Sequence, residues 1–138
     1  MAKLRPEQLS AAVNKSVAPI YIVTGDEPLL IQESCDMIRA AARKAGFIER
    51  DLYHCDSHFE WTQVLASANS MSLFADKKII ELRIPSGKPS DKGKVLQEYA
   101  QAPASDNLLL IIIDKLDKDV AKSKWFTALE QQGVHIQH

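Results

Sequence analysis

The fold is decided at Ile20-Tyr21-Ile22-Val23-Thr24, a run that passes directly into Gly25-Asp26-Glu27-Pro28. The first five residues are β-branched or aromatic, which predicts a buried strand. The glycine and proline that follow predict a turn and the first turn of a helix. This helix is expected to reach about Ala45 and to end at Gly46. Its apolar face is expected to carry Leu30, Cys35, Ile38 and Ala42.

The same alternation of strand and helix continues on both sides of this stretch. Further strands are expected at residues 51–55, 78–84, 108–113 and 134–136. Helices are expected from Pro6 and over residues 59–70, 94–101 and 121–132. Strands that alternate with helices predict an α/β domain of three layers with a mainly parallel sheet. The continuous apolar run Leu108–Ile113 predicts a strand that is buried on both faces.

Composition limits the classes of function. The 138 residues are 46% hydrophobic and 25% charged, as expected for one globular domain without an internal repeat or long linker. Lys and Arg number 17 against 18 Asp and Glu, so the net charge of −1 gives no general footprint for nucleic acid, although a local basic patch stays open. Direct DNA binding is therefore disfavoured.

The chain carries no signal for export or for a membrane. Its longest apolar run is too short to cross a bilayer, and Met1–Glu7 lacks the apolar core of a signal peptide. Cys35 and Cys55 are interpreted as free thiols in a reducing compartment. We expect a cytoplasmic protein with no membrane partner.

The first strand-to-helix turn is where a parallel sheet usually binds its ligand. A phosphate-binding loop would place two glycines, a lysine and a hydroxyl residue there. The turn has Gly25 but no second glycine and no lysine, and Pro28 removes one amide donor. Asp26 and Glu27 add negative charge and are expected to satisfy the amide groups of the helix N-terminus. We expect no bound cofactor, and an atypical nucleotide-binding or ATPase domain remains the alternative.

Other side chains that could bind a metal ion are better explained by structural roles. Asp114 follows a buried strand as a magnesium-binding carboxylate would, but Lys115 comes next, and a turn cap is the favoured role. No metal is expected from the group His54, Cys55, Asp56 and His58, because no second cluster completes a tetrahedral site.

No motif surrounds a catalytic serine, histidine and acid, so no catalytic residue is assigned, although a triad assembled in space stays open. The basic residues Arg39, Arg43 and Lys44 are interpreted as a solvated helix face.

The apolar step Met71-Ser72-Leu73-Phe74 lies between a predicted helix and a predicted strand. Two large apolar side chains at such a boundary either complete the core or are displayed to a partner. Polar residues surround the step, and the preceding helix already has its own apolar face. Apolar residues are mostly buried, which favours a core role for Leu73 and Phe74, whereas these local observations are consistent with display to a partner. Lys77 and Lys78 follow closely and are candidate contacts at the rim of such a surface, although surface solubility is the favoured explanation of their charge.

Five stretches, in this order, resemble one family over essentially the whole chain: the N-terminal domain of the delta subunit of the bacterial DNA polymerase III clamp loader. They are Arg5-Pro6-Glu7-Gln8-Leu9, Gly25-Asp26-Glu27-Pro28-Leu29-Leu30-Ile31-Gln32-Glu33-Ser34, Met71-Ser72-Leu73-Phe74-Ala75, the apolar run at Leu108, and Trp125-Phe126-Thr127-Ala128-Leu129. Each is modest alone, and together they make a specific match.

The resemblance implies an AAA+-type domain, similar to P-loop NTPases, whose nucleotide site is degenerate. It also implies that the beta sliding clamp is bound through Leu73 and Phe74, with Met71 and Ser72 as flanking contacts. The pair would enter an apolar pocket of the clamp and favour the opened ring, which is loaded onto primed DNA. The domain would have no catalytic activity of its own within the polymerase holoenzyme, a nucleotidyltransferase.

In this family the subunit continues into a lid domain and a helical collar. Residues 1–138 are therefore interpreted as an excised N-terminal, clamp-binding domain without them. The implied partners of the full-length protein are the clamp and the gamma/tau and delta prime subunits. Any DNA contact would be indirect or weak.

Overall fold

The computed structural model describes residues 2–4, 6–69, 77–85, 88–101, 106–114 and 117–138. The strands in these ranges are β1 (Ala2–Leu4), β2 (Ile20–Thr24), β3 (Phe47–His54), β4 (Lys77–Ile84), β5 (Asn107–Ile113) and β6 (Val134–Gln137). The helices are α1 (Pro6–Lys15), α2 (Pro28–Lys44), α3 (Thr62–Asn69), α4 (Lys94–Gln101), α5 (Lys118–Ala121) and α6 (Lys124–Gln132).

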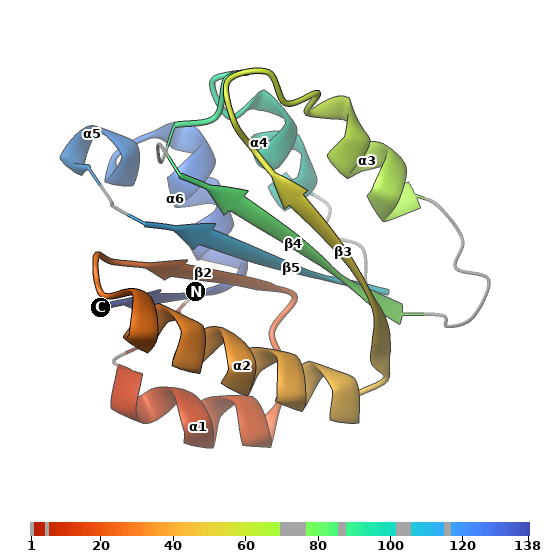
Figure 1. Cartoon of the computed structure of the whole chain (residues 1–138), viewed down its shortest axis with the longest axis vertical. Helices are drawn as coiled ribbons and strands as arrows, with labels where there is room; N and C mark the ends of the chain where they lie inside the picture. Colours follow the sequence, from red (N-terminus) through yellow and green to blue (C-terminus); the bar gives the residue numbers. More distant parts are fainter. Residues whose placement is uncertain (1, 5, 70–76, 86–87, 102–105, 115–116) are drawn as a thin grey trace.

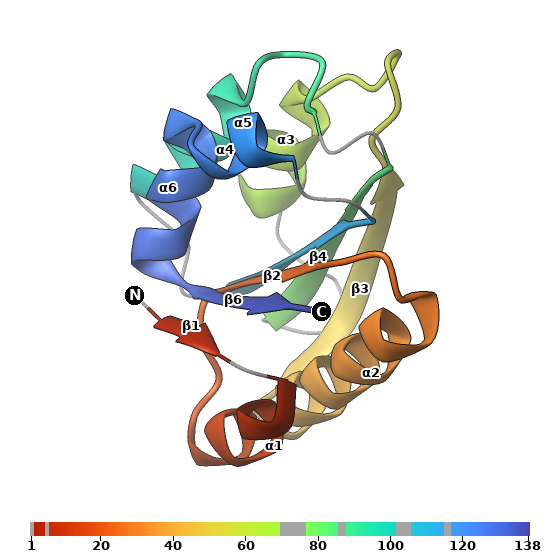
Figure 2. The same cartoon turned by 90° about the vertical axis from the view of Figure 1, so that its left-hand side faces the viewer.

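The strands pair in parallel to form one sheet in the order β1-β6-β2-β5-β4-β3. Helices α1 and α2 cover one face, and α3, α4, α5 and α6 cover the other (Figure 1, Figure 2). Because the strands are parallel, their carboxyl ends meet at one edge of the sheet and their amino ends at the opposite edge. The predicted three-layer α/β fold is confirmed.

Strand β5 shows why the sheet must be covered on both faces. All seven of its residues are buried. Leu109, Ile111 and Ile113 belong to the apolar cluster beneath α4 and α6. Leu108, Leu110 and Ile112 belong to the cluster beneath α1 and α2. Successive side chains of a strand point to opposite faces, so this continuous apolar run contributes to both cores.

Helix α2 differs from the prediction at its first turn. Leu30 was placed on the apolar face, but it is 43% exposed, and Leu29 is 67% exposed. The residue that faces the sheet at this turn is Ile31. The rest of the face is as predicted, with Cys35, Ile38 and Ala42 buried. The sequence has three apolar residues in a row here, and which of them is buried depends on how the helix is rotated against the sheet.

Several further boundaries differ from the predictions, among them the start of α3, which lies at Thr62 rather than at residue 59. The edge strand begins at Phe47 rather than at residue 51, so it is longer than expected. The helix expected over residues 121–132 begins only at Lys124, where Ser123 caps it by accepting a hydrogen bond from the amide of Phe126, and a separate short helix, α5, ends at Ala121 with Lys122 as its C-cap. Strand β1 was not expected; its backbone pairs with β6. None of the helices in the described ranges is long and apolar enough to cross a membrane.

Candidate functional site

The first strand-to-helix turn is filled by the chain itself. The amide of Gly25 donates to the carbonyl oxygen of Ile113 at 3.2 Å, and the amide of His138 donates to Thr24 at 2.8 Å. Gly25 has φ +142°, and a Cβ atom there would lie 2.8 Å from the backbone oxygen and Cβ of His138. The Gly25 amide, which would be the first phosphate donor in a phosphate-binding loop, is thus already hydrogen-bonded. His138 occupies the space next to it.

The side chains at the start of α2 provide no other donors that could bind a phosphate group. Glu27 occupies the cap position, but its side chain makes no capping hydrogen bond, and Pro28 fills the first helical position. The prediction that Glu27 satisfies the helix N-terminus through its carboxylate is therefore wrong. Asp26 and Glu27 are both exposed and bring negative charge to this turn. Neither residue supplies a donor for a phosphate oxygen.

The candidate metal-binding residues at positions 54–58 are not grouped as a metal site. Among the described residues, no three His, Cys, Asp or Glu side chains are grouped for a metal ion. Thr24 Oγ1 lies 2.9 Å from Nε2 of His135, whose Nδ1 lies 3.0 Å from Glu130. This is the order of a hydroxyl, histidine and acid triad, but the Thr24 hydroxyl has no exposed surface for a substrate to reach. We interpret the arrangement as a structural link between β2 and β6.

The apolar step Met71-Ser72-Leu73-Phe74 lies outside the described residues, and its placement stays a prediction. The described residues on either side are the end of α3 at Asn69 and the start of β4 at Lys77. The start of β4 lies at the amino edge of the parallel sheet, whereas the turn at Gly25 lies at the carboxyl edge. The two candidate sites are therefore at opposite edges of the sheet.

A polar network fixes both flanks of that step. Asp51 on β3 accepts a hydrogen bond from Ser67 of α3 at 2.6 Å and another from Lys78 of β4 at 3.2 Å. Asn107 of β5 donates to the carbonyl oxygen of Ala68 at 2.8 Å. Burial alone would raise the pKa of Asp51, but the bonds from Ser67 and Lys78 outweigh it and hold the pKa below its usual value. We call Asp51, Ser67, Lys78 and Asn107 the flank network.

The two candidate rim lysines have different environments. The Lys78 ammonium is buried and belongs to the flank network, so its role within the described residues is to hold strands together. Lys77 is half-buried, and its Nζ lies 5.3 Å from the centre of the Phe47 ring. Lys77 is therefore the one of the two with a charge that can reach a partner.

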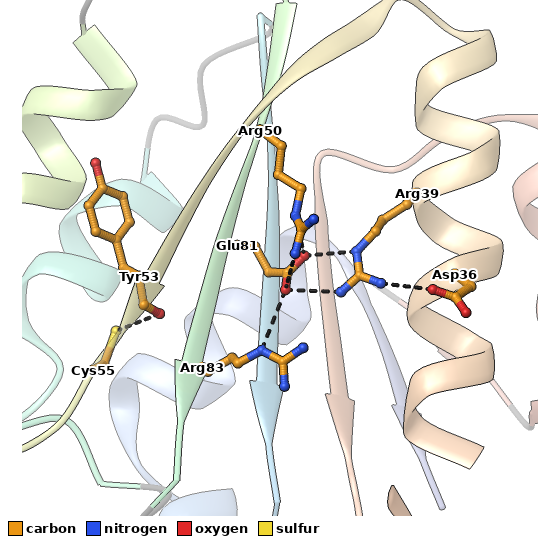
Figure 3. Close-up of polar contacts among 7 residues, drawn as sticks. All are labelled: Asp36, Arg39, Arg50, Tyr53, Cys55, Glu81 and Arg83. Atoms are coloured by element: carbon orange, nitrogen blue, oxygen red, sulfur yellow. Dashed lines mark hydrogen bonds and ion pairs between the residues drawn. The ribbon is translucent and has the colours of Figure 1, made fainter. Parts of the chain in front are cut away.

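A second polar cluster, which the sequence analysis missed, lies between α2 and strands β3 and β4 (Figure 3). The fully buried carboxylate of Glu81 accepts two bonds from Arg39, at 2.8 and 2.9 Å, and two from Arg50, at 3.1 and 3.3 Å. Nε of Arg83 lies 3.6 Å from it. Arg39 also contacts Asp36 at 2.9 Å. We call Glu81 with the three arginines the arginine cluster.

The arginine cluster corrects the interpretation of Arg39 as part of a solvated face, because only 16% of its side chain is exposed. Burial would raise the pKa of Glu81, but the bonds and charges of Arg39 and Arg50 outweigh it and lower that pKa. The sequence did carry a signal: Glu81 stands in the middle of an apolar strand. A carboxylate that is buried in a sheet needs charged partners.

A cavity of about 400 Å³ opens beside this cluster. Arg39, Arg50 and Arg83 line it together with Ile31 and Ile112. Asp114, which is exposed and was predicted to cap a turn, lies at its carboxyl-edge end. Within the described residues, the Asp114 side chain forms no hydrogen bond or ion pair.

Comparison with known proteins gives a consistent result. The profile of the family described as "DNA polymerase III, delta subunit" matches residues 21–138. The DNA polymerase III subunit delta of Escherichia coli (strain K12) is 34% identical over 137 residues, which are 99% of this chain and 40% of the relative. The subunit of the same name from Haemophilus influenzae is 34% identical over 95% of this chain and 38% of its own length. The chain thus spans about two fifths of the curated relatives it matches.

Solved structures agree on the fold. A Bacillus subtilis DNA clamp loader delta protein superposes with a TM-score of 0.74 at 19% identity, over 96% of this chain and 42% of that one. A DNA polymerase III gamma subunit-related protein from Thermotoga maritima superposes with a TM-score of 0.61 at 9% identity, over 96% of this chain and 45% of that one. At these identities the likeness concerns the fold alone.

Proposed function

This chain belongs to the family of DNA polymerase III delta subunits, and on that premise we propose that it is the clamp-binding, non-catalytic part of a replicative clamp loader. In this proposal Leu73 and Phe74 enter an apolar pocket of the beta sliding clamp, with Met71 and Ser72 beside them. Binding favours the opened ring, which the complete cytoplasmic loader, with its gamma/tau and delta prime subunits, places on primed DNA.

The observation that carries the proposal is the contrast between the two edges of the sheet. At the carboxyl edge, Gly25 is covered by His138, and no lysine is present in the turn. At the amino edge, the flank network holds the end of α3 and the start of β4 in place. A rigid frame on both sides of a short segment reduces the conformational entropy that is lost when the segment binds.

The apolar pair cannot supply high affinity alone. Full burial of a Leu and a Phe contributes about 3–6 kcal/mol together. That corresponds to a dissociation constant no better than about tens of micromolar, before the entropy cost of association. Tight binding therefore needs a wider surface, and Lys77, the first residue of β4, can contribute to it. Ring opening further requires stronger binding to the open clamp than to the closed one.

The test is surface plasmon resonance of the chain on immobilised beta clamp, comparing wild type with Leu73→Ala/Phe74→Ala. Leu29→Ala/Leu30→Ala is the matched control, because it removes two large side chains that are exposed on α2. Circular dichroism and thermal melting establish that all three proteins are folded. We expect binding to be lost only in the first variant. A folded wild type that does not bind the clamp would refute the proposal.

The ATPase alternative makes the opposite prediction. It requires magnesium-dependent nucleotide binding that is lost in Asp114→Ala. The covered turn at Gly25 and the absence of a lysine there argue against it. We expect no ATP hydrolysis by the purified chain above the level of a buffer control.

A further inference from the structure

The arginine cluster carries more positive charge than its carboxylate neutralises. Three guanidinium groups surround the two oxygens of Glu81, which leaves an excess of two charges. Asp36 lies against Arg39 and reduces the excess to one. Asp36 and Asp114 both line the cavity, and with Asp114 counted the charges balance, so the positive excess is local to the guanidinium groups around Glu81. Both aspartates are exposed, so water and salt screen their charges. Like charges held this close repel one another, and an added anion would relieve that repulsion.

The cluster also has hydrogen-bond donors to spare. Glu81 uses Nε and one terminal nitrogen of Arg50, but only Nε of Arg83, and that contact is long. Within the described residues, the two terminal nitrogens of Arg83 and one of Arg50 have no protein partner, and Figure 3 shows the terminal nitrogens of Arg83 without a contact to the residues drawn. The side chains of both arginines are 43% exposed, so a ligand from solvent can reach them.

The cavity is the right size for a small ligand. Its volume of about 400 Å³ lies at the small end of the range for small-molecule sites. Guanidinium groups match the oxygens of phosphate in pairs, which makes arginine the residue of choice for phosphate recognition. Ile31 and Ile112 form an apolar part of the wall, against which an attached organic group could pack.

We propose that the cavity between α2 and strands β3, β4 and β5 binds a phosphate group, either free or carried by a small molecule, through Arg50 and Arg83. Glu81 acts as a positioning residue, because its buried carboxylate holds Arg39 and Arg50 in their orientations. The site differs from a phosphate loop in two ways. It uses side chains instead of backbone amides, and the carboxylate at its end, Asp114, opposes the anion.

The test is isothermal titration calorimetry of the purified chain with inorganic phosphate at low ionic strength. We expect saturable binding in wild type and a loss of affinity of at least about tenfold in Arg83→Gln, because a hydrogen bond to a charged group is worth about that factor. Arg43→Gln is the control. Arg43 is an exposed arginine on α2, the helix that borders the cavity, but it is not one of the residues that line the cavity. This variant should bind phosphate as wild type does.

Asp114→Asn changes the affinity in the opposite direction. Removal of this negative charge should tighten phosphate binding, whereas a magnesium-nucleotide site would be weakened by the same substitution. Arg50→Gln provides a second loss-of-binding variant if Arg83→Gln fails to fold, as judged by circular dichroism. The Nε–H resonances of Arg50 and Arg83 should shift on addition of phosphate in NMR spectra.

Two further ligands distinguish the source of the phosphate group. Pyrophosphate and ADP should bind more tightly than inorganic phosphate if the physiological ligand is a phosphorylated small molecule, and no more tightly if it is free phosphate. The proposal is overturned if wild type shows no saturable binding at millimolar phosphate. Unchanged affinity in folded Arg83→Gln and Arg50→Gln, or weakened binding in Asp114→Asn, would overturn it equally. Leu73→Ala/Phe74→Ala should bind phosphate normally, so this test is independent of clamp binding.

Discussion

Nζ of Lys78 lies 3.2 Å from Oδ2 of Asp51, which joins the start of β4 to its neighbour β3. Lys78 is the second residue after positions 70–76, and the same Asp51 oxygen accepts a hydrogen bond from Ser67, near the end of α3. One carboxylate therefore fixes the chain both before and after the segment that we propose to bind the clamp. We expect this scaffold to help to position that segment for binding.

Asp51→Asn should weaken this scaffold. The substitution keeps the shape of the side chain but removes the charge opposite a buried ammonium. We expect a loss of about 1–2 kcal/mol in the free energy of unfolding, a moderate value because 39% of the Asp51 side chain is exposed. Clamp affinity should fall as well, since the flanks of residues 70–76 become less constrained. Urea unfolding and surface plasmon resonance measure the two effects.

The control for Asp51→Asn is Asp26→Asn, at an exposed carboxylate in the turn before α2. It should change neither stability nor clamp binding. If Asp51→Asn were as stable as wild type and bound the clamp equally well, the flank network would have no positioning role.

Lys77→Ala and Lys78→Ala should separate binding from stability. Lys77 loses only a partly exposed contact with the Phe47 ring, so the free energy of unfolding should fall by no more than about 1 kcal/mol. Its removal should weaken clamp binding a few-fold, and more at low salt than at high salt. Lys78→Ala should cost about 1–3 kcal/mol, because it removes a buried partner of Asp51. If urea unfolding showed a larger loss of stability for Lys77→Ala than for Lys78→Ala, our assignment of Lys78 as the structural lysine would be contradicted.

Glu81→Gln should be the most damaging single substitution in the arginine cluster. Arg39 and Arg50 would lose a fully buried carboxylate, which predicts a loss of about 3–5 kcal/mol. Chemical denaturation measures this loss. Glu98→Gln, at an exposed position of α4, is the control and should stay within about 0.5 kcal/mol of wild type.

The pH dependence of stability should also report on Glu81. Its folded-state pKa lies below the ordinary value of 4.5, so the unfolded chain takes up the proton first as the pH falls. The stabilisation is complete above pH 4.5 and is lost progressively as the pH drops from there through the lower folded-state pKa. Unfolding measured from neutral to acidic pH should show this decline in wild type and a shallower one in Glu81→Gln. Identical slopes would show that Glu81 does not contribute to it.

Both cysteines should be unreactive in the native protein. Cys35 and Cys55 are free and buried, and burial raises their thiol pKa values to about 11 and about 12. Little thiolate is present near pH 8, and the thiolate is the reactive form. Ellman's reagent should therefore modify neither thiol until denaturant is added, after which both should react. Rapid reaction of either thiol in the folded chain would contradict this placement.

The sequence by itself determined the alternation of strands and helices, except for strand β1 and the separate helix α5, and the need to bury the sheet on both faces. It did so because the relevant signals are local. The unbroken apolar run of β5 can only be satisfied between two layers. Gly46 follows the end of α2 with φ +102°, a backbone conformation that glycine adopts without strain. The degenerate turn at Gly25 was equally visible from the sequence, because a lysine and a second glycine are missing from it.

Only the tertiary structure decided which charged and apolar side chains are buried. Arg39 and Glu81 are 42 positions apart in the chain, and nothing local to either residue predicts their pairing. The rotation of α2 against the sheet buries Ile31 and exposes Leu30, although both are equally apolar neighbours. Hydrophobic periodicity reports which elements form, whereas the pairing of distant groups depends on how the elements pack, and that packing fixes the flank network and the arginine cluster.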